Sequence, residues 1–126
     1  MTVYLSEHIC DSARKKLEAA ATIVDNFDHP EEIDAIIART APVTAELLEK
    51  ATKLKVIGKH GVGYNNVDVA AVKAKGIPMV YTPLANADSV AEMVVGLFLL
   101  LERGLYAANQ KCRRGEFQKI APADFL

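Results

Sequence analysis

The stretch from Lys55 to Gly76 constrains the fold of this chain more than any other part of its sequence. It reads KVIGKHGVGYNNVDVAAVKAKG: a short β-branched run comes first, a glycine-rich segment follows, and apolar residues then recur at helical spacing. This order predicts a strand, a tight loop and a helix. Gly61 and Gly63 allow the backbone to approach a bound group closely, so the loop is a candidate site for a small anion.

The glycine loop lacks the pattern of a dinucleotide-binding turn. In the fingerprint G-x-G-x-x-G the third glycine lets the helix pack closely on the strand, and this chain has Asn66 at that position. The next strand candidate, PMVYT, is not followed by an acidic residue that could bind a ribose hydroxyl. We therefore do not expect this loop to bind a dinucleotide.

Strand and helix patterns alternate along the first part of the chain. The strand candidates are VYLSE at 3–7, TIVDNF at 22–27, IDAIIAR at 33–39, LKVIG at 54–58 and PMVYT at 78–82. The helical patterns between them are ICDSARKKLEAAA, a short EEI after Pro30, TAELLEKAT and the segment after Asn66. This alternation predicts an α/β fold: a flavodoxin-like, doubly wound parallel sheet of about five strands with helices on both faces.

A long apolar helix is expected after the last strand. The run SVAEMVVGLFLLL, residues 89–101, is apolar on nearly all sides, with Asp88 or Ser89 as its cap and Glu92 in its first turn. At about 13 residues it is shorter than the roughly 20 residues of a membrane span, so we expect it to pack in a core or an interface. Gly104 interrupts the pattern, and a polar helix follows.

Composition and charge exclude several classes of protein. The 126 residues are 51% hydrophobic and 25% charged, with a net charge of -1 and no block of one sign, so no nucleic-acid or membrane partner is expected. The N-terminus carries charges where a signal peptide needs an apolar run, which indicates a cytoplasmic protein. Cys10 and Cys112 form no C-x-x-C pair and have no histidine at ligand spacing, so we expect reduced thiols and no metal site.

Residues 54 to 117 resemble the D-isomer-specific 2-hydroxyacid dehydrogenases, in particular the D-3-phosphoglycerate dehydrogenases. The similarity lies in LKVIGKHGVGYNNVDVAAVKAKGIPMVYTP, in NADSVAEMVVGLFLLLERG and in RRGEF, which follow one another with the spacing of the family; residues 1 to 53 fit more loosely. The resemblance implies a substrate-binding domain over residues 1–103 and, over 104–126, the start of a connection to a nucleotide-binding domain. The family's cofactor-binding turn and its catalytic Arg, Glu and His have no counterpart in this sequence, so the chain alone is expected to be inactive.

The resemblance also suggests residues that bind the substrate, a small 2-hydroxy or 2-keto acid. In the family, backbone amides of the glycine turn hold the substrate carboxylate, and here those amides belong to Val62 and Gly63. Asn86 matches an asparagine that faces the cleft between substrate and nicotinamide. Arg39 lies where relatives present a basic or hydroxyl residue. Asn86 is equally suited to form a turn and Arg39 to be a surface charge, so both structural interpretations stay open.

Two further residues are candidates for contact with NAD, the cofactor that the resemblance implies. Thr82 matches a threonine that approaches the cofactor, and Lys59 stands where the family often has Arg or Lys beside the glycine turn. His60 is not a family signature, and we expect it to be a solvated loop residue. No catalytic residue and no metal ligand is assigned in this chain.

Two functions of other classes remain open from the sequence. The chain could be a non-catalytic module that binds a small anion at the glycine turn, or a subunit that only oligomerises through its apolar helix, because a fold alone does not fix a function. One sheet face cannot cover that helix on all sides. We therefore also expect a homo-oligomer, most simply a dimer.

Overall fold

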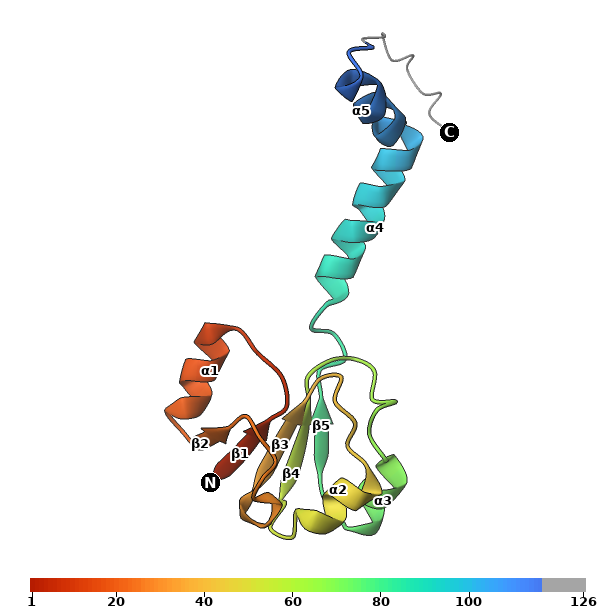
Figure 1. Cartoon of the computed structure of the whole chain (residues 1–126). Helices are drawn as coiled ribbons and strands as arrows, with labels where there is room; N and C mark the ends of the chain where they lie inside the picture. Colours follow the sequence, from red (N-terminus) through yellow and green to blue (C-terminus); the bar gives the residue numbers. More distant parts are fainter. Residues whose placement is uncertain (117–126) are drawn as a thin grey trace. The chain divides into compact units, whose positions relative to one another are not determined.

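The first part of the chain forms a five-stranded parallel sheet (Figure 1). The computed structural model describes residues 1–116, and Met1–Ala85 make up its first compact unit. The strands are β1 (Thr2–Leu5), β2 (Thr22–Val24), β3 (Ala35–Ala38), β4 (Val56–Lys59) and β5 (Met79–Tyr81). Their order is β2-β1-β3-β4-β5, with parallel pairing throughout, which is the order of flavodoxin-like sheets. The predicted α/β fold with about five parallel strands is confirmed.

Short helical segments connect the strands. They are α1 (Asp11–Glu18), the 3-10 turn η1 (Pro30–Glu32), α2 (Ala45–Lys50) and α3 (Val69–Ala74). Local capping explains where α2 and α3 begin: Thr44 Oγ1 accepts from the Leu47 amide at 3.2 Å, and Asp68 Oδ1 accepts from the Ala71 amide at 2.9 Å. The helix predicted at 9–21 is shorter in the structure.

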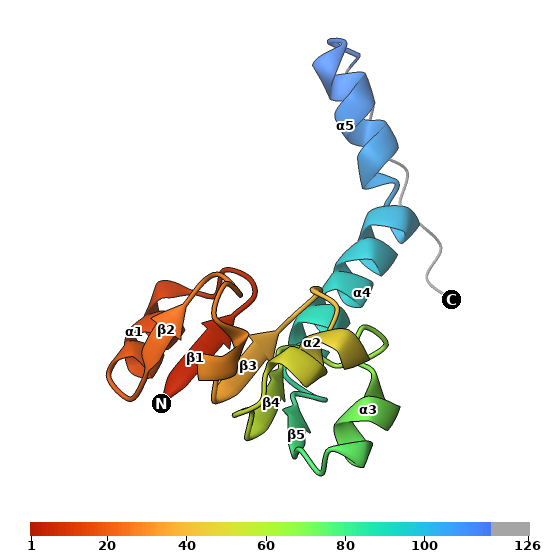
Figure 2. The ribbon, with the colours of Figure 1, turned by 60° about the horizontal axis from the view of Figure 1, so that its bottom comes forward.

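One face of the sheet carries the hydrophobic core. The register aligns four large side chains on this face: Tyr4, Ile36, Ile57 and Met79. They pack with Leu48 of α2 and Val72 of α3, both buried. Figure 2 shows α2 in front of the sheet with α3 beside it. Burial of such side chains, at about 1.5–3 kcal/mol each, is the main force that holds the helices on this face.

The opposite face is covered less completely. There the register aligns Leu5, Ile37, Gly58 and Val80. Leu5 is 2% exposed, whereas Val80 of the edge strand β5 is 60% exposed. Helix α1 contacts β2 and buries none of its own residues. Within Met1–Ala85, helical cover on this face therefore stops short of β5.

The second unit begins at Asn86 and contains α4 (Ala87–Glu102) and α5 (Leu105–Arg113), on either side of Gly104. The predicted cap of α4 at Asp88 or Ser89 is wrong: the helix starts after Asn86, and no side chain caps it. Asp88 instead lies in the first turn, where its charge favours the helix dipole. Because the start is earlier, Glu92 lies beyond the first turn, not within it as predicted.

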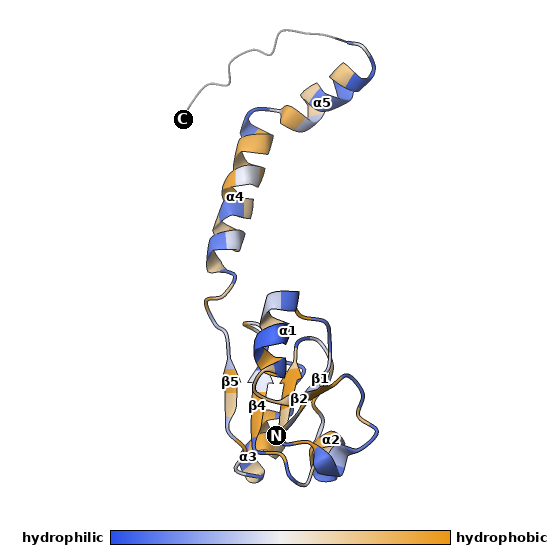
Figure 3. Cartoon of the chain, turned by 90° about the vertical axis from the view of Figure 1, so that its left-hand side faces the viewer, coloured by the Kyte–Doolittle hydropathy of each residue, from blue (hydrophilic) through white to orange (hydrophobic). Residues whose placement is uncertain are grey.

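Most of the large apolar side chains of α4 are exposed. They are Val90, Met93, Val94, Val95, Leu97, Phe98, Leu99 and Leu101. Figure 3 shows hydrophobic residues along this helix with polar residues between them. No helix among residues 1–116 has the length and apolar character needed to cross a membrane. The end of the expected connecting segment, including IAPADFL at 120–126, lies outside the described residues.

Candidate functional site

The carboxyl ends of β3, β4 and β5 bring most of the predicted site residues to one edge of the sheet. Ala38 pairs with Lys59, and Lys59 pairs with Tyr81, so the residues that follow these strands leave the sheet side by side. Ligands of open parallel sheets bind at this edge. Arg39 and Thr82 begin two of these loops, and the glycine turn 61–66 follows β4. Asn86 belongs to the second unit and is described with that unit alone.

Thr82 fixes the start of the glycine turn. The Gly61 amide donates to Thr82 Oγ1 at 3.0 Å, and the Thr82 amide donates to the Gly61 carbonyl at 3.3 Å. Gly61 has a φ of 140°, a value that residues with a side chain rarely adopt. The turn at this point therefore requires glycine, and the side chain predicted to approach the cofactor is engaged in holding it.

The next two amides of the turn are open. Within residues 1–116, the backbone N–H groups from Val62 to Asn66 make no hydrogen bond, those of Val62 and Gly63 among them, and Val62 is 44% exposed. A methyl group in place of a Gly63 hydrogen would meet no heavy atom within 4 Å, and the φ of Gly63 lies outside the left-handed region. The fold thus does not need glycine at position 63. The two amides and the space in front of Gly63 are accessible to a ligand.

A buried ammonium group lies beside the turn. Lys59 is 5% exposed, and its Nζ donates to the Arg39 carbonyl. A Cβ atom at position 61 would lie 3.5 Å from this Nζ, which places the positive charge next to Gly61. A charge removed from water needs hydrogen-bond partners or an opposite charge nearby. The position of Lys59 therefore favours an anion at the turn.

Glu7, which the sequence reasoning missed, clamps the neighbouring loop. Its carboxylate accepts from the backbone amides of Arg39, Thr40 and Ala41 at 2.6, 2.6 and 2.8 Å, and also from the hydroxyls of Thr40 and Ser6. Desolvation by itself raises the pKa of Glu7, but the hydrogen bonds from Thr40, Ser6 and Arg39 outweigh it and lower the pKa to about 2. The only sequence signal was an acidic residue at the end of the first predicted strand, at the same sheet edge as the glycine turn.

Asn66 ties the end of the glycine turn to the same loop. Its side-chain amide donates to the Ala41 carbonyl at 2.6 Å and to the Arg39 carbonyl at 3.4 Å. This explains why a polar residue occupies the position where a dinucleotide turn has its third glycine. The glycine turn and the 39–41 loop are held together by side chains from both sides.

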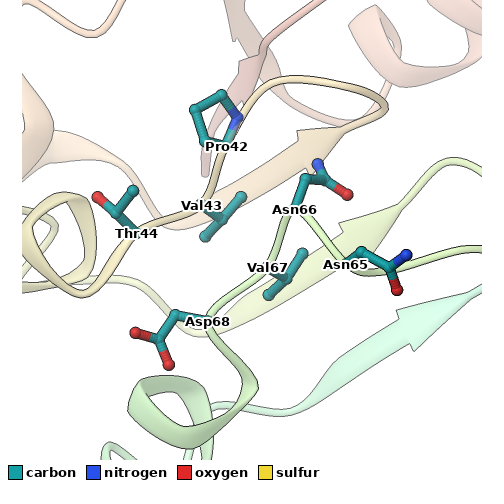
Figure 4. A pocket seen from close by; sticks show the side chains of 7 residues that line it. All are labelled: Pro42, Val43, Thr44, Asn65, Asn66, Val67 and Asp68. Atoms are coloured by element: carbon teal, nitrogen blue, oxygen red, sulfur yellow. The ribbon is translucent and has the colours of Figure 1, made fainter.

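A pocket of about 420 Å³ lies where the two loops lead into α2 and α3 (Figure 4). It is lined by Pro42, Val43 and Thr44 from one segment and by Asn65, Asn66, Val67 and Asp68 from the other. A parallel bridge between Val43 and Val67 joins the two segments. The lining contains the Asp68 carboxylate and no cationic side chain, so this pocket suits an anionic ligand poorly.

Two tyrosines lie against each other beside the turn and were also missed from the sequence. The ring centroids of Tyr64 and Tyr81 are 5.6 Å apart and the ring planes are inclined by 69°, which is an edge-to-face contact. Both residues are partly exposed. Tyr64 belongs to the glycine turn, and Tyr81 ends β5. Only the pairing of Lys59 with Tyr81 in the sheet could have indicated this contact. Within the described part of the chain, no His, Cys, Asp or Glu residues form a group that could hold a metal ion.

One family model matches nearly the whole chain. The family model described as the D-isomer specific 2-hydroxyacid dehydrogenase catalytic domain matches residues 3–121. The chain belongs to this family. The resemblance inferred from residues 54 to 117 is therefore confirmed, and the match extends to the first strand and helix, where the sequence fitted more loosely.

Relatives of this 2-hydroxyacid dehydrogenase domain are longer proteins. It is 40% identical over 91 residues to a hydroxypyruvate reductase of Thermotoga maritima, covering 71% of this chain and 30% of that protein. It is 43% identical over 89 residues to a D-3-phosphoglycerate dehydrogenase of Methanocaldococcus jannaschii, covering 70% of this chain and 17% of that protein. A solved 2-hydroxyacid dehydrogenase of Ketogulonicigenium vulgare superposes with a TM-score of 0.83 at 26% identity, over 97% of this chain and 42% of that chain. The chain thus spans less than a third of the length of these two curated relatives.

The glycine turn of this 2-hydroxyacid dehydrogenase domain does not fit the pyrophosphate of NAD. In a dinucleotide turn, the helix N-terminus offers open amides to the phosphates. Here the Asp68 carboxylate already accepts from the Ala71 amide of α3, and its negative charge would repel a phosphate. Within residues 1–116, the amides of Val62 and Gly63 in the turn itself remain open.

Proposed function

We propose that this domain binds the carboxylate of a small D-2-hydroxy or 2-keto acid at the glycine turn. The observation that carries the proposal is the pair of adjacent open amides of Val62 and Gly63, beside the buried ammonium of Lys59. Hydrogen bonds from N–H groups to an ionised acceptor are stronger than those to neutral acceptors. Two such amides and one nearby cation are a sufficient set for one carboxylate.

The neighbouring residues have different parts in this proposal. Thr82 keeps the turn in shape through its two hydrogen bonds with Gly61. Lys59 contributes a positive charge at the turn. This charge would attract an anionic substrate, and it is also compatible with the contact between Lys59 and NAD that the family resemblance implies. Arg39 has its backbone bonded to Glu7 and Lys59 and an exposed side chain, which could reach a substituent such as the phosphate of a 3-phosphoglycerate-like acid. Asn86 remains the family-based candidate for the cleft between substrate and nicotinamide.

In the whole protein, we infer that this domain serves an NAD-dependent oxidoreductase acting on the CH–OH group of the acid. NAD, when bound, supplies the hydride acceptor. The part of the chain that the structure describes forms no dinucleotide turn, so we expect its residues to bind and orient the acid. We expect the chain by itself to show no turnover. The domain boundary at 103/104 and a cytoplasmic location stay predictions.

The exposed apolar surface of α4 supports a second element of the proposal, self-association. Its large side chains contribute about 1.5–3 kcal/mol each when fully buried, and large exposed apolar patches usually mark an interface. We infer a homo-oligomer, most simply a dimer, that buries this helix. An oligomerisation module without acid binding would share this property, so only ligand binding distinguishes it from the proposed function.

A titration of the chain with pyruvate, followed by the amide NMR signals of residues 61–64, tests the acid site. We expect saturable shifts at Val62 and Gly63 with pyruvate and none with acetone, which has a methyl group in place of the carboxylate. Shifts at Thr44 and Asp68 instead would place the ligand in the pocket of Figure 4. A site with a dissociation constant of about 1 mM would be saturated at tens of millimolar pyruvate. If no saturable shift appears up to that concentration, the proposal is refuted.

A further inference from the structure

One peptide unit lies between Glu7 and Lys59. The Thr40 amide donates to Glu7 Oε1 at 2.6 Å, and the Arg39 carbonyl, which belongs to the same peptide, accepts from the Lys59 ammonium. In a trans peptide the N–H and C=O groups point in opposite directions, and residues 1–116 contain no cis peptide bond. The two charged side chains therefore hold opposite ends of the Arg39–Thr40 peptide.

Glu7 fixes the orientation of this peptide from within the chain. The amides on either side of it, at Arg39 and Ala41, donate to the same carboxylate at 2.6 and 2.8 Å. Successive N–H groups that converge in this way form an anion-binding concavity. Because Glu7 already fills the concavity, no external anion is needed to order the loop, and the Arg39 carbonyl is directed away from Glu7, toward Lys59.

The place of the Lys59 ammonium depends on that carbonyl. Lys59 is 5% exposed, so water satisfies little of its hydrogen-bonding capacity, and the Arg39 carbonyl is the acceptor that its Nζ has within the described residues. If the peptide rotated, the ammonium would lose this acceptor and move toward solvent, away from Gly61. A long, flexible lysine side chain has many such alternative rotamers.

We infer that Glu7 is a positioning residue for the acid site: it orients the Arg39–Thr40 peptide, whose carbonyl holds the Lys59 ammonium beside the glycine turn. The inference rests on the proposed function, because the site it supports is the one for a 2-hydroxy or 2-keto acid. Glu7 does not touch the ligand. It acts through one peptide and one lysine, and its carboxylate stays ionised because the hydrogen bonds from the Thr40 hydroxyl and amide, from Ser6 and from Arg39 outweigh desolvation and lower its pKa.

The Glu7→Gln variant of the full chain tests the inference. Glutamine keeps the shape but turns one acceptor oxygen into an NH₂ donor, which faces N–H groups of the loop. We expect the dissociation constant for pyruvate to rise about 10-fold, as for loss of a charge-assisted hydrogen bond. We also expect the exchange-protected ammonium signal of Lys59 in NMR spectra to disappear while the amide signals of β3 and β4 stay in place. Glu46→Gln is the matched control, since it removes the same charge from an exposed pair with Lys50 on α2 and should change neither property.

A second variant covers the case in which Glu7→Gln does not fold. Thr40→Val removes only the hydroxyl donor to Glu7 and keeps the carboxylate with its three amide bonds. It should weaken the Lys59 ammonium signal, as Glu7→Gln does, and raise the dissociation constant for pyruvate by about 2- to 3-fold. If Glu7→Gln folds and retains both the Lys59 signal and the pyruvate affinity, Glu7 is not a positioning residue. If Glu7→Gln does not fold, the same result with Thr40→Val leads to the same conclusion.

The same experiment separates this inference from the proposed function. If the unmodified chain binds no pyruvate, the proposed acid site is refuted, whereas the Lys59 ammonium signal in the variants still reports whether Glu7 holds the lysine. If pyruvate binds but loses no affinity when the Lys59 signal is lost, the site stands and the positioning role of Glu7 is overturned.

Discussion

The most direct test of the acid site is the replacement of Gly63 by valine. Apart from the two neighbouring residues, a Cβ atom at this position would meet no heavy atom within 4 Å, and the φ of Gly63 lies outside the left-handed region. The substitution should therefore change the free energy of unfolding by no more than about 0.5 kcal/mol, as for surface sites in general. A bulky side chain would, however, occupy the space in front of the amides of Val62 and Gly63.

The expected loss of binding follows from the hydrogen bonds at risk. A hydrogen bond to a charged group contributes about 1.5–3 kcal/mol, and each 1.4 kcal/mol corresponds to a tenfold change in affinity. If valine prevents one of the two amide bonds, pyruvate affinity should fall at least about 10-fold. In a whole enzyme that contains this domain, kcat/KM should fall by a similar factor.

The assay combines an NMR titration with pyruvate and a thermal unfolding curve of the same sample. Val62→Ala is the control, because it shortens the neighbouring side chain and keeps both amides, so its affinity should stay within about 2-fold. Unchanged pyruvate affinity in folded Gly63→Val would show that the acid binds elsewhere. A large loss in Val62→Ala would show that a side chain, not the backbone, holds the ligand.

Three further predictions concern stability and assembly. Because the pKa of Glu7 is lowered from 4.5 to about 2 in the folded chain, its stabilising effect is complete above pH 4.5 and is lost as the pH falls toward 2; acid unfolding should therefore be less steep in Glu7→Gln, and identical curves would contradict this. Asp68→Ala should cost about 1 kcal/mol in urea unfolding, since the α3 cap at Ala71 is lost, and a change near zero would show that α3 does not need it. If α4 forms the oligomer interface, Phe98→Lys combined with Leu101→Lys should give a monomer in sedimentation experiments. An oligomer that persists with intact helix content would place the interface elsewhere.

Local rules were enough to predict much of the sheet unit. The strands follow from short β-branched runs, and the alternation with helices gives their parallel pairing. The Thr44 cap is of the kind that a sequence reveals, because the hydroxyl and the amide that donates to it are three residues apart. The same holds for Asp68, whose carboxylate accepts from the amide three residues later. Features set by neighbours within four residues are visible in a sequence.

The parts of the site that the sequence did not reveal depend on distant residues. Glu7 contacts a loop that lies 32 to 34 residues further along the chain, and Asn66 contacts one 25 to 27 residues earlier. Both contacts exist only because β1, β3 and β4 are neighbours in the sheet, an order that no local pattern encodes. The start of α4 was misplaced for another reason: Asp88 is a good cap by type, but it stabilises the first turn equally well.

The incomplete cover of β5 has a consequence for the motions of the site. Within Met1–Ala85 this three-residue strand pairs with β4 alone, and its Val80 side chain is 60% exposed. Its hydrogen bonds should therefore open more often than those of the central strand β3. Thr82, which holds Gly61, follows β5 directly. Each local opening of β5 would therefore release the glycine turn, while an acid bound at the turn would oppose such openings. Amide hydrogen exchange in β5 should then slow on addition of pyruvate, whereas the amides of β1 and β3 should keep their exchange rates.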